Sequence, residues 1–188
     1  MRKVFAVLPL MSVLAGCFTS RPPEIRDWTV EFCWRAKPVA QPKFGVVRVS
    51  QVSVRAPYDA RGLQVMRADG SLAQDPYNRF AASPSQLLKG PVQDAFAAFG
   101  AFDGVVGPSS SAAVSTVAEV AVSRLALDCR TDGARVADVA LTVLVLDRDR
   151  KIAALLHGDG RADAAGGDYS KAFSEAFSSA MESASRQL

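Results

Sequence analysis

The feature that most constrains the fold is a run of three long apolar or alternating segments, separated by very short connections. These segments span residues 115–127, 135–146 and 151–161. Asp132-Gly133 joins the first two segments, and residues 147–150 join the last two. Tight turns force neighbouring strands to pair antiparallel, because parallel neighbours need a crossover of about a dozen residues or more. The C-terminal half is therefore predicted to form an antiparallel meander.

Helical patterns lie on both sides of this meander. Ser83-Pro84-Ser85-Gln86 combines a capping residue, a proline suited to the first helical position and the glutamine of a capping box. Apolar residues at helical spacing continue to Phe99, and Gly90-Pro91 predicts a kink or a broken first turn on the way. A second helix is predicted over residues 168–186, with Asp168 as its N-cap and one apolar stripe.

Shorter alternating segments predict strands at residues 28–34, 45–54 and 63–67. Within residues 45–54 the alternation slips by one position, so that Val52 or Val54 follows Val47 and Val49 toward the core. Together the patterns predict a single α+β domain over residues 28–188. Its expected architecture is an antiparallel β-sheet with two α-helices packed on one face.

The N-terminus has the pattern of a bacterial lipoprotein leader. Arg2 and Lys3 precede an apolar stretch at residues 4–13, which is too short to span a membrane but suits a signal peptide. Leu14-Ala15-Gly16-Cys17 then resembles the lipobox, in which the cysteine is lipidated and becomes the new N-terminus. We therefore expect residues 1–16 to be a lipoprotein signal peptide. The alternatives are an ordinary signal peptide with an incidental cysteine, or a buried N-terminal helix.

Lipid on Cys17 would anchor the chain firmly, because a diacylglyceryl group and an amide-linked acyl chain act together whereas one chain binds only marginally. Residues 17–27, which include Pro22-Pro23, are then a lipidated tether. The expected location is the cell envelope, facing the periplasm. Phe18 stands after the cysteine where enterobacterial inner-membrane sorting uses Asp, and this resemblance favours the outer membrane over the inner membrane.

Charge and cysteine content exclude some partners. Without Arg2 and Lys3, the 22 basic residues fall to 20, against 19 acidic residues. A nearly neutral chain with no long run of Lys or Arg is not expected to bind nucleic acid. Beyond Cys17, the sequence has Cys33 and Cys129, which could form a disulfide in an oxidising compartment or remain separate thiols. The sequence leaves both alternatives open.

The residue types of common catalytic sites are sparse. His157 is the single histidine, and no Cys/His cluster has the spacing of a zinc site. Ser109-Ser110-Ser111 could serve a hydrolase only if the fold brought His157 beside it. We expect a flexible loop there instead, and a protein that is not an enzyme, with no metal and no cofactor.

Three segments resemble the ABC-type transport auxiliary lipoproteins, which include the lipoprotein partner of the paraquat-inducible MCE system. The first is residues 54–63, VRAPYDARGL, continuing to Met66-Arg67 in place of the family's aromatic-arginine end. The second is residues 74–80, QDPYNRF, before the first helix, and the third is Gly167-Asp168-Tyr169, at the start of the last helix. The resemblance implies a non-catalytic accessory component of an ABC/MCE-type lipid transport system. It also implies contact with an MCE-type or other periplasmic transporter component, and a possible homo-oligomer.

Other small envelope lipoproteins remain an alternative, such as an activator of a cell-wall synthase or an outer-membrane assembly factor. Loop 104–114 and segment 56–80 are the candidate contact surfaces, because loops on a rigid scaffold often carry binding residues. Leu72, Tyr77 and Phe80 could present apolar area to a partner or pack under the first helix.

Overall fold

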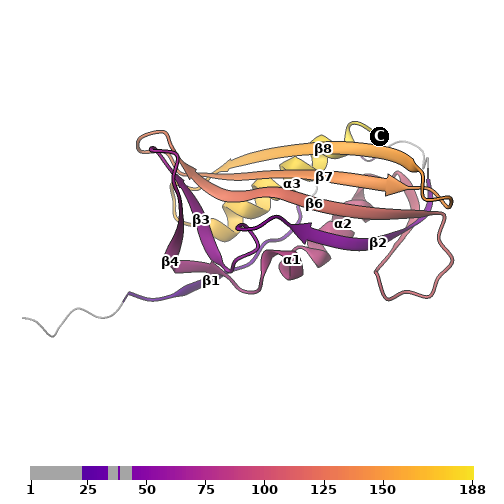
Figure 1. Cartoon of the computed structure of the whole chain (residues 1–188), viewed down its shortest axis with the longest axis horizontal. Helices are drawn as coiled ribbons and strands as arrows, with labels where there is room; N and C mark the ends of the chain where they lie inside the picture. The colour runs from indigo at the N-terminus through magenta and orange to yellow at the C-terminus, as the bar shows by residue number, and fades with distance from the viewer. Residues whose placement is uncertain (1–22, 34–37, 39–43) are drawn as a thin grey trace, which may run out of the picture.

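The computed structural model describes residues 23–33, 38 and 44–188. Within them the chain forms one mixed sheet of eight strands, with its helices on a single face (Figure 1). This arrangement confirms the predicted α+β class. In chain order, the elements are β1 (Arg26–Trp28), β2 (Phe44–Val54), β3 (Gly62–Arg67), β4 (Leu72–Phe80), α1 (Pro84–Leu87), α2 (Lys89–Phe99), β5 (Phe102–Val106), β6 (Thr116–Cys129), β7 (Val136–Leu146), β8 (Ile152–Asp163) and α3 (Tyr169–Ser185).

The predicted meander is confirmed as β6, β7 and β8. β7 pairs antiparallel with β6 on one side and with β8 on the other, so that Val143 lies opposite Val120 and Leu156. Gly133, in the first turn, has a φ of +71°, which glycine adopts without steric cost. The short connections therefore decide the strand direction in this half of the sheet.

The rest of the sheet corrects the expectation of an all-antiparallel arrangement. β6 pairs in parallel with β2 and, near its C-terminal end, with β3. β1 with β4 and β2 with β5 are also parallel pairs, and only the β3–β4 hairpin is antiparallel here. β2 and β3 reach β6 through connections that contain a hairpin and two helices, so no tight turn fixes their relative direction.

Several boundaries in the N-terminal half differ from the predicted ones. β2 confirms the slip in register, which lies between Val49 and Gln51, and Val52 rather than Val54 is buried after it. β4 escaped prediction because it contains Pro76 and mostly polar residues, which disfavour a strand assignment. β5 extends into the expected loop 104–114.

The first helix is capped differently from the prediction. The Ser83 side chain makes no capping hydrogen bond; instead, the Asp59 carboxylate accepts bonds from the Ser85 amide at 2.7 Å and from the Ser85 hydroxyl at 2.9 Å. The predicted kink is a break at Leu88 between α1 and α2. Because α2 begins at Lys89, Pro91 lies in a first turn, where its missing N–H leaves no bond unmade.

The last helix is confirmed with its cap: the Asp168 carboxylate accepts a hydrogen bond from the Lys171 amide at 3.0 Å. α3 lies directly on β8, because two glycines of that strand face it. A Cβ atom added at Gly160 would overlap the carbonyl oxygen of Ala176, and one added at Gly158 would overlap that of Ala180. Glycine at these positions therefore sets the distance between helix and sheet.

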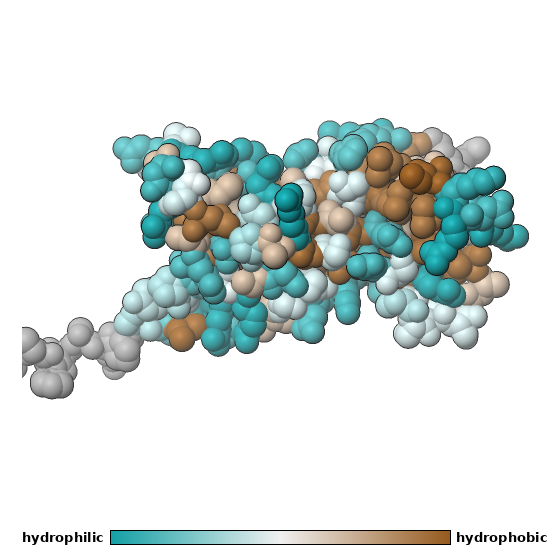
Figure 2. All heavy atoms as spheres, viewed as in Figure 1, coloured by the Kyte–Doolittle hydropathy of each residue, from teal (hydrophilic) through white to brown (hydrophobic). Residues whose placement is uncertain are grey.

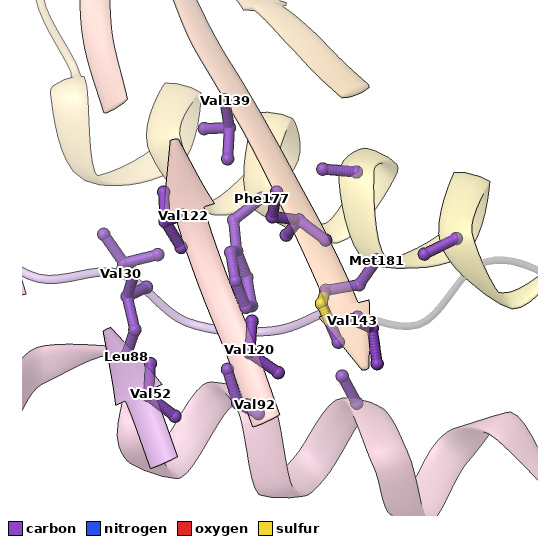
Figure 3. Packing of buried hydrophobic residues seen from close by; sticks show 14 of the residues in the cluster. Val30, Val52, Leu88, Val92, Val120, Val122, Val139, Val143, Phe177 and Met181 are labelled. Atoms are coloured by element: carbon purple, nitrogen blue, oxygen red, sulfur yellow. The ribbon is translucent and has the colours of Figure 1, made fainter. Parts of the chain in front are cut away.

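The hydrophobic core fills the space between the sheet and the helices. Figure 3 shows Phe177 and Met181 of α3 meeting Val120 and Val143 of the sheet, with Val92 of α2 on the other side of the cluster. All five side chains are at most 1% exposed. Both predicted helices therefore pack on the same face, as expected.

Candidate functional site

The meander has one face covered by helices and one open face. Alternate residues of a strand point to opposite faces. Leu141, Val143 and Val145 of β7 point into the core, so Leu144 and Leu146 point to the other side. No helix of the described residues covers this open face, which Figure 1 presents toward the viewer.

One end of the open face carries a cluster of apolar side chains, bordered by Glu119 and Arg48. Leu144 lies opposite Leu155, and Leu146 lies opposite both Val117 and Ile152. Ile152 is 64% exposed and Leu155 is 51% exposed. Figure 2 shows hydrophobic residues gathered at this end of the sheet. We call these residues the open-face patch: Val117, Leu144, Leu146, Ile152 and Leu155.

The other end of the open face is charged. Asp128 and Asp138 are almost fully buried there, between three half-exposed arginines. Arg130 and Arg161 bind Asp128 at 2.8 and 2.7 Å, and their hydrogen bonds, those of Arg130 first, hold its pKa well below the usual range. Arg124 Nε lies 3.0 Å from Asp138 Oδ1 without hydrogen-bond geometry, so their attraction is Coulombic.

With Asp159 near Arg124 at 3.5 Å, three carboxylates balance three guanidinium groups in this network. A balanced network stabilises the fold and offers no excess charge to a ligand. The apolar end of the open face is therefore the better candidate for a contact surface.

The N-terminal segment that leads from the predicted tether binds the domain in two ways. Arg26 and Asp27, placed by the sequence in the tether, belong to β1 beside β4. Asp27 also accepts hydrogen bonds from Arg79 at 2.7 Å and Arg61 at 3.1 Å. These groups are exposed, so the pairs contribute little energy but fix where the chain enters the sheet.

Residues 29–33, predicted to continue the first strand, run along α3 instead; we call them the strap. The Ser170 hydroxyl donates to the Thr29 carbonyl at 2.9 Å, while Ser174 and Ser178 accept from the amides of Glu31 and Cys33, each at 2.9 Å. Two extended residues advance about as far as four helical ones, so serines four apart match alternate strap residues. The remaining strap side chains, Val30 and Phe32, face the core.

The predicted site residues are scattered. Cys17 lies outside the described residues. Cys33, exposed at the end of the strap, and Cys129, half-buried at the end of β6, are both free thiols. Burial raises the pKa of the Cys129 thiol. The structure therefore contains no bridge between these two cysteines.

Ser110 and His157 lie in different parts of the open face. Arg48 holds the loop by donating to the carbonyls of Ser110 and Ala112, at 3.0 and 2.8 Å. Arg48 pairs with Val117 of β6, which in turn pairs with Leu146 of β7. His157 pairs with Thr142, which lies four residues, or about 13 Å, from Leu146 along β7. The imidazole Nδ1 of His157 is 3.3 Å from the Thr142 hydroxyl. No hydrogen bond of the described residues joins His157 to the serine loop.

The two predicted contact surfaces are only partly exposed. Leu72 and Tyr77 are 38% and 46% exposed, whereas Phe80 is buried against Phe173 with ring centroids 5.2 Å apart. The sequence interpretation missed the open-face patch, although both faces of the strand beginning at Ile152 carry apolar residues there. That two-sided pattern was the available signal. A one-sided strand would alternate with polar residues.

In the described part of the chain, no helix is both long and apolar enough to cross a membrane. The same part of the chain has no group of three His, Cys, Asp or Glu side chains arranged to hold a metal ion.

Comparison with known proteins finds a similarity in fold to solved structures. No family model and no curated protein matches the sequence. The crystal structure of protein XCC0632 from Xanthomonas campestris, described with the family model DUF330, superposes with a TM-score of 0.62 at 18% identity, covering 84% of this chain and 87% of that chain. A second crystal structure, of an uncharacterized protein, gives a TM-score of 0.51 at 13% identity over 72% and 80% of the two chains. The chain therefore shares its fold with a DUF330 protein.

Proposed function

We propose that this chain is a lipid-anchored, non-catalytic accessory protein of an ABC/MCE-type envelope lipid transport system. Lipid on Cys17 holds it to a membrane, with the domain facing the periplasm and the outer membrane favoured. The domain then binds a periplasmic transporter component through the open-face patch. The lipobox-like leader and the resemblance of segments 54–67, 74–80 and 167–169 support this assignment.

The observation that carries the proposal is the exposure of the open-face patch. Leu155 and Ile152 are more than half exposed, beside the half-buried Leu144 and the buried Leu146. Apolar side chains clustered on an otherwise polar surface are typical of protein contact sites. A partner that covers them would bury area by the same hydrophobic effect that drives folding.

The position of the patch fits an anchored protein. The chain enters the sheet at β1, and the patch lies at the start of β8, at the other end of the long axis (Figure 1). A domain held by its N-terminal end would present the patch away from its attachment point. A partner could reach it without displacing the tether.

Site-specific cross-linking in intact cells tests this assignment. A photo-reactive amino acid replaces Leu155 in the full-length protein. Leu72, an exposed leucine on β4, and Arg186, exposed after α3, serve as matched positions. We expect a cross-link from Leu155 to an MCE-type or other transporter component, and none from Arg186.

The identity of the cross-linked partner decides between the two interaction functions. A cell-wall synthase or an outer-membrane assembly protein captured at Leu155 would replace the transport assignment by that alternative. Cross-linking to the transporter at Leu72 alone would move the contact surface to segment 56–80. Absence of any specific product at both leucines would contradict the proposal.

A further inference from the structure

A hollow of about 340 Å³ lies where the sheet extends past the N-terminal end of α3. We call it the Arg135 hollow. Its size falls within the usual range of small-molecule sites. It lies on the helix side of the sheet, whereas the open-face patch lies on the other side and at the opposite end of the strands. Its lining includes Val65, Asp75, Leu127, Cys129, Arg135 and Tyr169.

The floor of the Arg135 hollow is apolar. Val65 of β3 pairs with Leu127 of β6, and both side chains belong to or border the hydrophobic core. Cys129, two residues further along β6, points to the same side and borders the core as well. Leu127 is only 2% exposed, so the half-buried Val65 and Cys129 form the accessible part of this floor. The floor is suited to a short hydrocarbon chain.

The rim of the hollow supplies hydrogen-bond donors. Arg135 is exposed, and one of its guanidinium nitrogens donates to the Tyr169 hydroxyl at 3.3 Å. Arginine cannot accept a hydrogen bond, so the phenol oxygen accepts here and its O–H remains a donor. Among the described residues, no carboxylate forms an ion pair with Arg135. Two donors, one of them cationic, therefore adjoin the apolar floor.

One carboxylate lines the hollow, and its oxygens are already occupied. Asp75 accepts hydrogen bonds from the amides of Tyr77 and Asn78, at 2.8 and 2.9 Å, and from the Asn78 side chain at 3.0 Å. These bonds hold the carboxylate against its own turn in β4. Asp75 keeps its negative charge, and Arg135 is the cation of the lining that can bind an anionic group directly.

We propose that the Arg135 hollow binds a small anionic amphiphile. A carboxylate or phosphate head would bind Arg135 and the Tyr169 hydroxyl, because guanidinium groups match both anions in geometry. The hydrocarbon chain would lie on the half-buried Val65 and Cys129, above the buried Leu127. This site is separate from the open-face patch and does not depend on the partner proposed for it.

Protection of Cys129 from alkylation tests the site. Full-length protein carrying Cys17→Ser retains two thiols, Cys129 in the hollow and the exposed Cys33 on the strap. N-ethylmaleimide reacts with both, and peptide mass spectrometry measures each rate separately. The probes are sodium laurate below its micelle concentration, dodecyl maltoside as a neutral amphiphile, and inorganic phosphate as an anion without a chain.

We expect laurate to slow the alkylation of Cys129 and leave Cys33 unchanged. Arg135→Gln should raise the laurate concentration that gives half-maximal protection by about tenfold, because it removes a charge-assisted hydrogen bond. Arg148→Gln, in the exposed β7–β8 turn, is the matched control and should behave like the parent. Unchanged unfolding midpoints would show that both variants fold.

Three results would overturn the proposal. Equal protection by dodecyl maltoside would mean that the head group is not recognised. Equal protection of Cys129 by inorganic phosphate, at the same concentration as laurate, would mean that the hydrocarbon chain of the ligand contributes nothing to binding. Absence of Cys129 protection by laurate would mean that the hollow does not bind this class of ligand.

Discussion

The two faces of the β6–β8 meander are built from the same three strands, yet they serve different ends. The helix-covered face contains Val143, Val139 and the glycines of β8, all sealed under α3. The open face keeps Leu155 and Ile152 exposed at one end and a balanced ion network at the other. The helix-covered face therefore carries most of the stability, the ion network at one end of the open face adds to it, and the apolar end is available for contacts at little cost to stability.

Truncation of a core aromatic should give the largest effect. Phe177 is fully buried and contacts Phe32 of the strap, with ring centroids 6.4 Å apart. Phe177→Ala should lower the free energy of unfolding by about 3–5 kcal/mol, because it removes buried area and leaves a cavity. Urea denaturation measures the change. A loss no larger than that of Leu155→Ala would contradict the contrast between the faces.

Two neighbouring residues of β8 give the sharpest version of the comparison. Gly160→Ala should destabilise the domain by about 1–3 kcal/mol or more, since its new Cβ would overlap the Ala176 carbonyl of α3. Asp159→Ala, one residue away on the open face, should cost less than about 1 kcal/mol because its ion pair is exposed. Thermal unfolding of the two variants, measured side by side, tests the prediction.

The ion network predicts a dependence of stability on pH. Its arginines lower the pKa of Asp128 in the folded protein below the unfolded value of about 4. The carboxylate therefore contributes stability above pH 4, and this contribution is lost as the pH falls below 4. Asp128→Asn should be less stable than the parent at neutral pH. It should also lose less stability between pH 5 and pH 3, measured by urea titration, and an unchanged acid slope would contradict the assignment.

The smallest effect on stability should come from the open-face patch. Leu155→Ser should change the free energy of unfolding by at most about 0.5 kcal/mol, because the side chain is already half exposed. The same variant should lose recovery of the native partner in a pull-down from solubilised envelopes. A stable variant that still recovers the partner in full would separate the patch from function.

The sequence predicted the elements that are determined by local signals, such as a short turn between two strands or a capping residue at the start of a helix. Asp132-Gly133 and residues 147–150 fixed the direction of the meander strands, and Asp168 marked the start of α3. Alternation predicted an extended segment over residues 28–34, and Val30 and Phe32 of this segment face the core. It could not reveal that serines of α3, rather than a strand, bind the backbone beside them.

The rest depends on contacts between distant parts of the chain. Parallel pairing of β2 and β3 with β6 follows from long connections that have no local signature. Asp59 replaces the predicted capping box from 26 positions away. The Arg135 hollow likewise requires β3, β6 and α3 to meet. Arg135 therefore did not stand out in the sequence, and Tyr169 did so only as part of the segment that begins the last helix.

The proposed function requires the domain to be held beside a membrane through Cys17. Mass spectrometry of the protein isolated from its native membranes tests this requirement most directly. We expect an N-terminal peptide that begins at Cys17 and carries a diacylglyceryl group and an amide-linked acyl chain. An unmodified Cys17 thiol, or a chain that still carries residues 1–16, would contradict the membrane anchor and the function built on it.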